Sequence, residues 1–163
     1  MRRETVSLLN LAGARLWPDL TEADVDWLFD QRETGASLKV GEAAAILRAT
    51  GGEPRLVARC LRERADAGPD GAVDYERIVA GHDIATSWFV PFKRNNSDAT
   101  KARRFLKEAD QGVYAAPWFS DAVKRRLFWK NALAVREVDG VTRLRWRCDA
   151  LREAGRGILE CED

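Results

Sequence analysis

The sequence predicts a mainly α-helical protein made of two modules: a four-helix module over residues 1–92, and a small α+β module with one β-hairpin over residues 93–163. Three observations predict this class. Apolar residues recur at helical spacing through most of the chain. The pair Asp139-Gly140 separates two alternating segments, which is the strongest short hairpin signal. The charge also changes sign, because the first module has 11 basic and 15 acidic side chains and the second has 16 and 11.

Four helices are expected in the first module, and each is marked by a start or stop signal. Thr21 can cap the first helix, because its hydroxyl can accept a hydrogen bond from the first turn. The second helix runs from Val40 to Thr50 and ends at a glycine pair. The third begins at Pro54, whose fixed φ suits a first helical position. A loop with glycine and proline at 67–71 then leads to a fourth helix that opens at Tyr75.

An aromatic run over residues 87–92, followed by polar residues, marks the junction between the modules, which we place near residues 84–97. We expect this run to pack between the modules, because a contiguous exposed apolar patch is a liability. Its Trp88, Phe89 and Phe92 are also the side chains through which an adaptor or inhibitor would bind a protein partner.

The second module is expected to contain two helices, a hairpin and a closing helix. Residue Ser97 or Asp98 can cap the first helix, and Ser120 or Asp121 can cap the second. The hairpin spans residues 134–147, where apolar and polar residues alternate around the Asp-Gly turn. These signals predict an α+β arrangement with a single pair of strands.

The loop between the third and fourth helices resembles the EF-hand calcium loop of the calmodulin family. Acidic side chains stand at the first, fifth and ninth positions of this loop (Asp66, Asp70 and Asp74), and Gly71 stands at the sharp turn of the sixth. The resemblance covers about residues 21–82. It implies a degenerate pair of EF-hands in the first module.

Several residues depart from the family pattern. Gly68 offers no side-chain oxygen at the third position, Pro69 stiffens the loop, and Arg77 stands where the family uses a bidentate glutamate. The first loop of the pair lies between the first and second helices. There Leu38 fits the apolar position and Glu42 fits the last position, and the residues at the other positions do not match the family pattern. Three interpretations therefore stay open: a calcium site at the three aspartates, a metal-free structural pair, or an unrelated helical bundle.

The order of elements in the second module is similar to that of winged helix-turn-helix regulators, over about residues 98–160. A capped helix leads into a strand, the Asp139-Gly140 turn, a second strand and a tail helix. The resemblance implies a recognition helix followed by a wing, which place cations in the major groove and along phosphates. DNA or another nucleic acid would then be contacted by six cationic side chains: Lys124, Arg125, Lys130, Arg136, Arg143 and Arg145.

The charge of this stretch favours an anionic partner. Residues 93–147 contain 14 basic and 6 acidic side chains, a net charge of +8. The same arginines can instead form a solvated face or pair with the acidic first module. We therefore expect a binding protein whose basic module contacts nucleic acid or a nucleoprotein complex and whose helical module contacts protein. The alternatives are an adaptor or inhibitor without nucleic-acid binding, and a calcium-responsive EF-hand protein.

Most of the six tryptophans are expected to be packed against other side chains. Trp27 is expected in the core of the first module, Trp129 at a packing seam, and Trp146 on the core-facing side of the hairpin. Stacking of an exposed tryptophan on a nucleic-acid base is the functional alternative.

The composition excludes several classes of protein. No window of about 18 apolar residues is present, so no transmembrane helix is expected. No signal peptide is evident, which favours a cytoplasmic protein. Three cysteines without a paired motif and a single histidine, His82, argue against a disulfide framework, a zinc site or a resident cofactor. Because no acid, base and nucleophile set is evident, we do not expect an enzyme.

Overall fold

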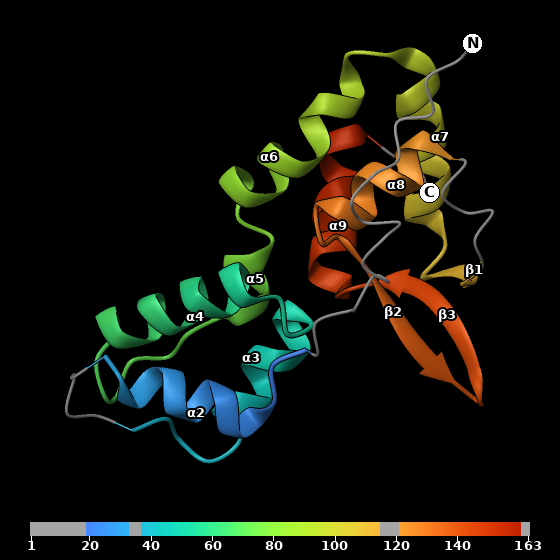
Figure 1. The fold of residues 1–163 in the computed structure, drawn as a ribbon. Helices are drawn as coiled ribbons and strands as arrows, with labels where there is room; N and C mark the ends of the chain where they lie inside the picture. Colours follow the sequence, from blue (N-terminus) through green and yellow to red (C-terminus); the bar gives the residue numbers. More distant parts are fainter. Residues whose placement is uncertain (1–18, 33–36, 115–120, 161–163) are drawn as a thin grey trace, which may run out of the picture.

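A computed structural model describes residues 19–32, 37–114 and 121–160. The described residues form eight helices and one three-stranded antiparallel sheet (Figure 1), which confirms the mainly helical class with a small β element near the C-terminus. The first five helices are α2 (Glu22–Asp30), α3 (Glu42–Thr50), α4 (Pro54–Asp66), α5 (Tyr75–Val79) and α6 (His82–Lys93). The remaining elements are α7 (Asn96–Lys107), β1 (Asp110–Val113), α8 (Ala122–Trp129), β2 (Leu133–Val138), β3 (Val141–Trp146) and α9 (Asp149–Leu159).

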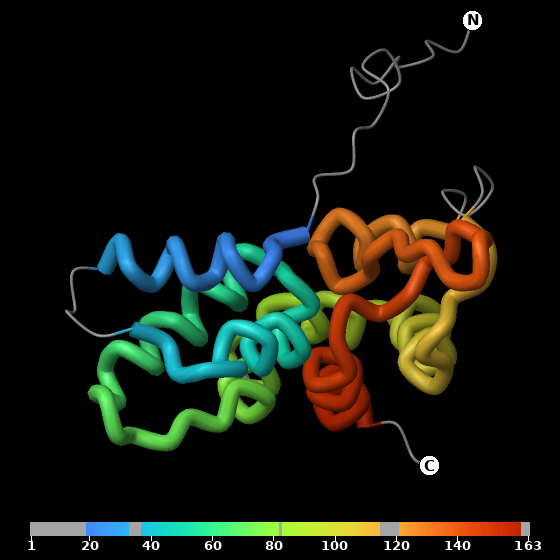
Figure 2. The backbone as a smooth tube through the Cα atoms, turned by 90° about the horizontal axis from the view of Figure 1, so that it is seen from below, coloured from blue at the N-terminus to red at the C-terminus, as the bar shows by residue number. Residues whose placement is uncertain are grey.

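The elements form two groups in space. Helices α2 to α5 lie together at one end, and α7, α8, α9 and the sheet lie at the other (Figures 1 and 2). Helix α6 leads from the first group to the second, and the β2–β3 hairpin projects away from the helices (Figure 1).

The predicted start signals of the first helices are present. Thr21 and Asp24 form a reciprocal cap at the start of α2, in which the Asp24 N–H donates to the Thr21 hydroxyl at 3.3 Å and the Thr21 N–H donates to the Asp24 carboxylate at 2.8 Å. Helix α3 begins at Glu42, two residues after the predicted start, and ends at Gly51, whose φ of +60° suits glycine. Pro54 opens α4 as predicted.

The segment over residues 84–97, where we place the junction, contains the end of one helix and the start of the next, and the predicted cap of the second helix is wrong. The aromatic run is helical and lies within α6, which contains Pro91 and continues to Lys93. Helix α7 begins at Asn96 after a cap by Asn95, not by Ser97 or Asp98. The Asn95 side chain accepts hydrogen bonds from two backbone N–H groups of the first turn, so it satisfies the helix start earlier than predicted.

The predicted hairpin is confirmed, and a third strand joins it. Val138 pairs with Val141 across the two-residue turn, where Asp139 and Gly140 have φ values of +51° and +73°. Positive φ at both turn positions is what a tight hairpin with the normal strand twist requires. Strand β1, which was not predicted, pairs with β3, so the strand order is β1-β3-β2.

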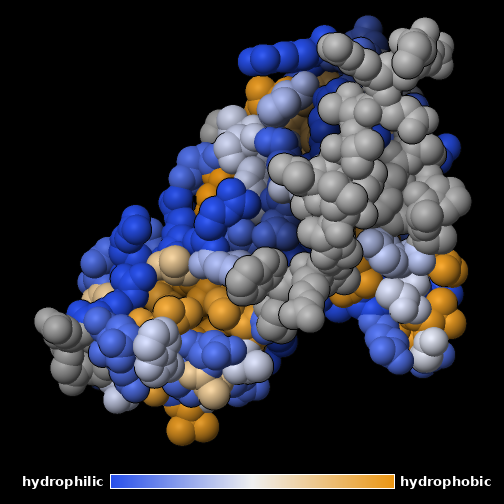
Figure 3. All heavy atoms as spheres, in the orientation of Figure 1, coloured by the Kyte–Doolittle hydropathy of each residue, from blue (hydrophilic) through white to orange (hydrophobic). Residues whose placement is uncertain are grey.

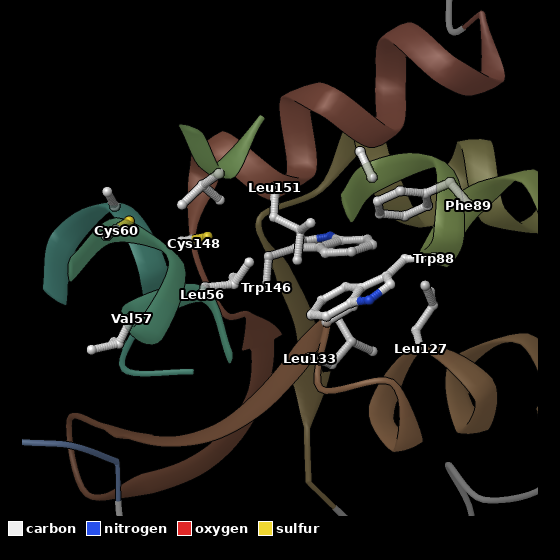
Figure 4. Close-up of a cluster of buried hydrophobic side chains, with 14 of the residues drawn as sticks. Leu56, Val57, Cys60, Trp88, Phe89, Leu127, Leu133, Trp146, Cys148 and Leu151 are labelled. Carbon is white, nitrogen blue, oxygen red and sulfur yellow. The ribbon is translucent and has the colours of Figure 1, made fainter. Parts of the chain in front are cut away.

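One hydrophobic core extends through both groups of elements. Leu56 and Cys60 of the first group and Leu151 of α9 point into the same cluster as the aromatic residues of α6 (Figure 4). The Phe89 ring lies 6.0 Å from the ring of Trp146, centroid to centroid. A module boundary after residue 92 stays a prediction, and the core continues across it.

The prediction that Trp88, Phe89 and Phe92 bind a partner is corrected by their burial. The exposed fractions of these side chains are 6%, 0% and 0%. Phe89 packs against the ring of Trp146 on β3, and the guanidinium of Arg55 on α4 lies over the ring of Trp88. These three side chains stabilise the fold and present no surface to another protein.

Candidate nucleic-acid interface

The EF-hand-like loop does not gather its acidic side chains. Asp66, Asp70 and Asp74 are exposed. Asp74 caps α5 instead, where its carboxylate accepts a hydrogen bond from the N–H of Arg77 at 3.0 Å. Across the described ranges, no three His, Cys, Asp or Glu side chains come close enough to hold a metal ion. The structure therefore does not bring the three predicted ligands together as a metal site.

An arginine from the preceding helix is bound to this loop. The Arg64 side chain, on α4, is 2% exposed. Its Nη1 donates to the carbonyl of Gly68, its Nη2 donates to the carbonyl of Pro69 at 3.2 Å, and its Nε lies 2.9 Å from a carboxylate oxygen of Glu42. A protein cation thus binds two carbonyls of this loop together with the carboxylate of Glu42, which stands at the last position of the first loop.

The carboxylate of Glu42 is held ionised by its partners. Burial raises the pKa of this carboxyl, but hydrogen bonds from the Lys39 N–H, the Arg64 guanidinium and the Tyr75 hydroxyl outweigh burial and lower the pKa below its ordinary value of 4.5. Glu42 on α3 therefore connects the first loop, α4 and α5 through charge-assisted hydrogen bonds.

This pKa predicts a pH dependence of stability. A carboxyl whose pKa is lowered by folding stabilises the protein above its ordinary pKa, and this contribution is lost as the pH falls through the lower folded value. Between pH 7 and pH 3, the wild-type free energy of unfolding should fall more steeply than that of Glu42→Gln. Urea denaturation at each pH measures both curves, and parallel curves would contradict the prediction.

Two of the six predicted contact residues are folded back onto the protein. The amine of Lys124 donates to the carbonyl of Gln111 at 3.0 Å and lies 4.9 Å from the centre of the Phe105 ring. The amine of Lys130 donates to the carbonyl of Ser87 at 3.0 Å. These lysines hold α8 against its neighbours, whereas Arg125 on the same helix is exposed.

The other three predicted contact residues lie on one face of the sheet. Leu144 and Trp146 point into the core, so the intervening residues of β3 point to the opposite face. Arg136 of β2 is directly opposite Arg143, and Arg145 follows two residues later. Arg147 continues this alternation just beyond β3. We call these four residues, Arg136, Arg143, Arg145 and Arg147, the arginine face.

Like charges directly opposite in a sheet repel each other, and nearby carboxylates compensate for the repulsion. Arg136 forms an ion pair with Asp19, and Arg143 forms one with Asp110 at 3.0 Å. The Gly112 N–H donates to the Asp110 carboxylate and lowers its pKa, and the charges of Arg143 and Arg145 lower it further. The predicted alternative, pairing of arginines with the acidic N-terminal module, is thus present at Arg136.

Arg147 joins the arginine face to the N-terminal helices. Its side chain is 10% exposed. Nη1 lies 2.6 Å from a carboxylate oxygen of Asp19 and donates to the carbonyl of Gly51 at 3.1 Å. Nε and Nη2 donate to the backbone and side-chain oxygens of Asn131 at 3.0 and 3.2 Å. The Arg147 guanidinium therefore connects three segments of the chain: the one before α2, the one after α3 and the one after α8.

A cleft of about 350 Å³ lies at the end of the arginine face. Three of the four arginines of this face line it, and Arg48 of α3 completes it from the other group of helices. Two carboxylates, Glu137 and Asp149, also line it, so positive charges outnumber negative ones by four to two. Within the described ranges, the side chains of Arg48 and Arg145 form no hydrogen bond or ion pair, although Arg145 lies opposite Asp110 and its charge lowers the pKa of that carboxyl. Their guanidinium groups are available to an anionic ligand.

Sequence reasoning missed Arg48 and the exposure of two tryptophans, and it placed Arg147 on the second hairpin strand without choosing it as a contact residue. Figure 3 shows that polar side chains cover most of the visible face, with small apolar areas between them. Against this surface, Trp27 is 60% exposed and Trp129 is 55% exposed. Trp27 was predicted to be in the core, but it lies two residues from both Val25 and Phe29, which place the buried face of α2 on the opposite side.

The buried thiols offer no reactive group to the cleft. Burial raises the pKa of Cys60 to about 12 and that of Cys148 to about 11.

In the part of the chain that the structure describes, no helix is both long and apolar enough to cross a membrane. Comparisons of the chain with protein-family models, with curated proteins and with solved structures find no match.

Proposed function

We propose that this chain is a non-enzymatic binding protein whose C-terminal basic part binds the phosphate backbone of a nucleic acid. The arginine face and its cleft are the contact surface for the nucleic acid, and the acidic N-terminal helices are the surface for protein contact. The observation that supports the proposal most is that Arg48 and Arg145, which are 97 residues apart in the sequence, line one cleft, and that neither side chain forms a hydrogen bond or an ion pair among the described residues.

Guanidinium groups suit this role for a physical reason. Arginine stays charged at every relevant pH and presents a planar set of donors that matches the oxygens of a phosphate. The opposed Arg136 and Arg143 each keep a carboxylate partner, and their guanidinium groups add donors to the same face of the sheet. The surplus of positive charge over residues 93–147 extends the attraction beyond the cleft itself.

The proposal is tested by fluorescence anisotropy of a labelled mixed-sequence DNA duplex, a DNA single strand and an RNA, at low and at physiological salt. The wild type should bind at low salt and lose affinity steeply as salt rises, because each bound phosphate releases counterions. Arg48→Ala/Arg145→Ala should weaken binding about tenfold or more and should reduce the slope of log affinity against log salt by about 2.

A charge-matched control separates the cleft from net charge. Lys39→Ala/Arg62→Ala also removes two positive charges from exposed positions, one in the loop before α3 and one on α4. It should leave the salt slope within experimental error of wild type. Absence of binding to all three probes at low salt would overturn the proposal. A complex that resists nuclease and high salt would instead favour the adaptor function.

A further inference from the structure

Trp129 is an exposed aromatic side chain in the basic part of the chain. It is the last residue of α8, and 55% of it is exposed, whereas Trp88 and Trp146 are each 6% exposed. Its ring meets the Phe128 ring edge-on, at 5.8 Å between centroids and 73° between planes. This edge contact supports the Trp129 ring on one side while much of it faces solvent.

The charge around Trp129 distinguishes it from the other exposed tryptophan. Trp27 lies on α2, whose nine residues include four acidic and no basic side chains, so a phosphate backbone would be repelled there. Trp129 lies one helical turn after Arg125, which is also exposed. Among the described tryptophans, Trp129 alone combines exposure with cationic neighbours.

The position of Trp129 connects it to the arginine face. Helix α8 ends at Trp129, and two residues later Asn131 accepts two of the hydrogen bonds that Arg147 donates. A strand of nucleic acid that contacts the cleft can therefore continue past the end of α8. Lys124 and Lys130, the lysines that a recognition helix would offer to a duplex groove, instead donate to backbone carbonyls of this chain.

We propose that Trp129 stacks on an unpaired base, and that the nucleic acid bound by the arginine face is therefore single-stranded. This inference rests on the proposed function. Only an unpaired base exposes its face to an aromatic ring, and such stacking is sequence-tolerant because every base has such a face. The phosphates of the strand would contact the arginine face while one base covers the exposed Trp129 ring.

The test compares a single strand with a duplex of the same sequence, by anisotropy, for the wild type and three variants. Trp129→Ala should weaken single-strand binding about 5- to 150-fold and should change duplex binding less than about twofold. Trp129→Phe should keep most of the single-strand affinity, because it retains a ring. Trp27→Ala is the matched control, with a similar loss of exposed aromatic surface, and should bind as the wild type does.

A spectroscopic readout separates stacking from a structural role. Intrinsic tryptophan fluorescence should be quenched when the wild type binds a single strand, and this part of the quenching should be lost in Trp129→Phe even though the strand still binds. Equal single-strand affinity of Trp129→Ala and wild type would overturn the inference and leave the proposed function standing. Absence of any wild-type binding would overturn the proposed function itself, so the two failures are distinguishable.

Discussion

Arg64→Ala is expected to destabilise the protein by about 3–5 kcal/mol, because it leaves the charge of Glu42 without its buried partner. The Arg64 side chain is 2% exposed and the Glu42 side chain is 17% exposed. The substitution also leaves the carbonyls of Gly68 and Pro69 without their arginine donor, so the loop between α4 and α5 loses its main support. Urea denaturation followed by circular dichroism measures the difference.

Two further variants make this prediction specific to the buried ion pair. Arg62→Ala removes an exposed arginine two residues away on the same helix and should change stability by less than about 0.5 kcal/mol. Glu42→Leu/Arg64→Leu removes both charges and should be more stable than Arg64→Ala, because no unpaired charge stays buried. A loss below about 1 kcal/mol in Arg64→Ala would contradict the assigned role.

Gly155→Ala is expected to destabilise the core by about 1–3 kcal/mol. A β-carbon at this position of α9 would lie 2.6 Å from Cζ of Phe89 and 2.9 Å from a methyl carbon of Leu106. Both side chains are fully buried, and Phe89 also packs against Trp146, so they have little space into which to move. The added methyl group would therefore push α9 away from α6 and α7.

Gly157→Ala, on the same helix, is the matched control. A β-carbon there meets no atom within 4 Å, so alanine should stabilise α9 by about 0.5–1 kcal/mol through its higher helix propensity. Thermal unfolding of the two variants should therefore shift in opposite directions from the wild type. If the unfolding temperatures of both variants shift in the same direction, close packing is not the reason why position 155 requires glycine.

The elements with strong local signals could be predicted from the sequence. The Thr21 cap, Pro54 and the Asp139-Gly140 turn each specify a backbone geometry within a few residues, and the structure has a helix start or turn at each. Strand β1 could not be predicted in this way. Its four residues include Gly112 at a φ of +93° and show no alternation, so the strand depends on pairing with β3.

The candidate site was predicted only in part, for a similar reason. Alternation in the hairpin is local, so it places Arg136, Arg143 and Arg145 on one face. Arg48 reaches the same cleft from α3 through tertiary packing, and nothing near it in the sequence signals this. The aspartates of the EF-hand-like loop followed a family pattern, but the buried Arg64 that binds the loop lies outside that pattern.

The hydrogen bonds and the ion pair of the Arg147 side chain affect when the N-terminal helices can complete their packing during synthesis. Asp19 precedes Arg147 by 128 residues and Gly51 precedes it by 96. At about 5–20 residues per second, Asp19 is incorporated into the chain roughly 6–26 s before Arg147. Throughout that interval the first helices lack the guanidinium that joins them to the hairpin. The N-terminal helices therefore reach their final packing only after Arg147 has been synthesised.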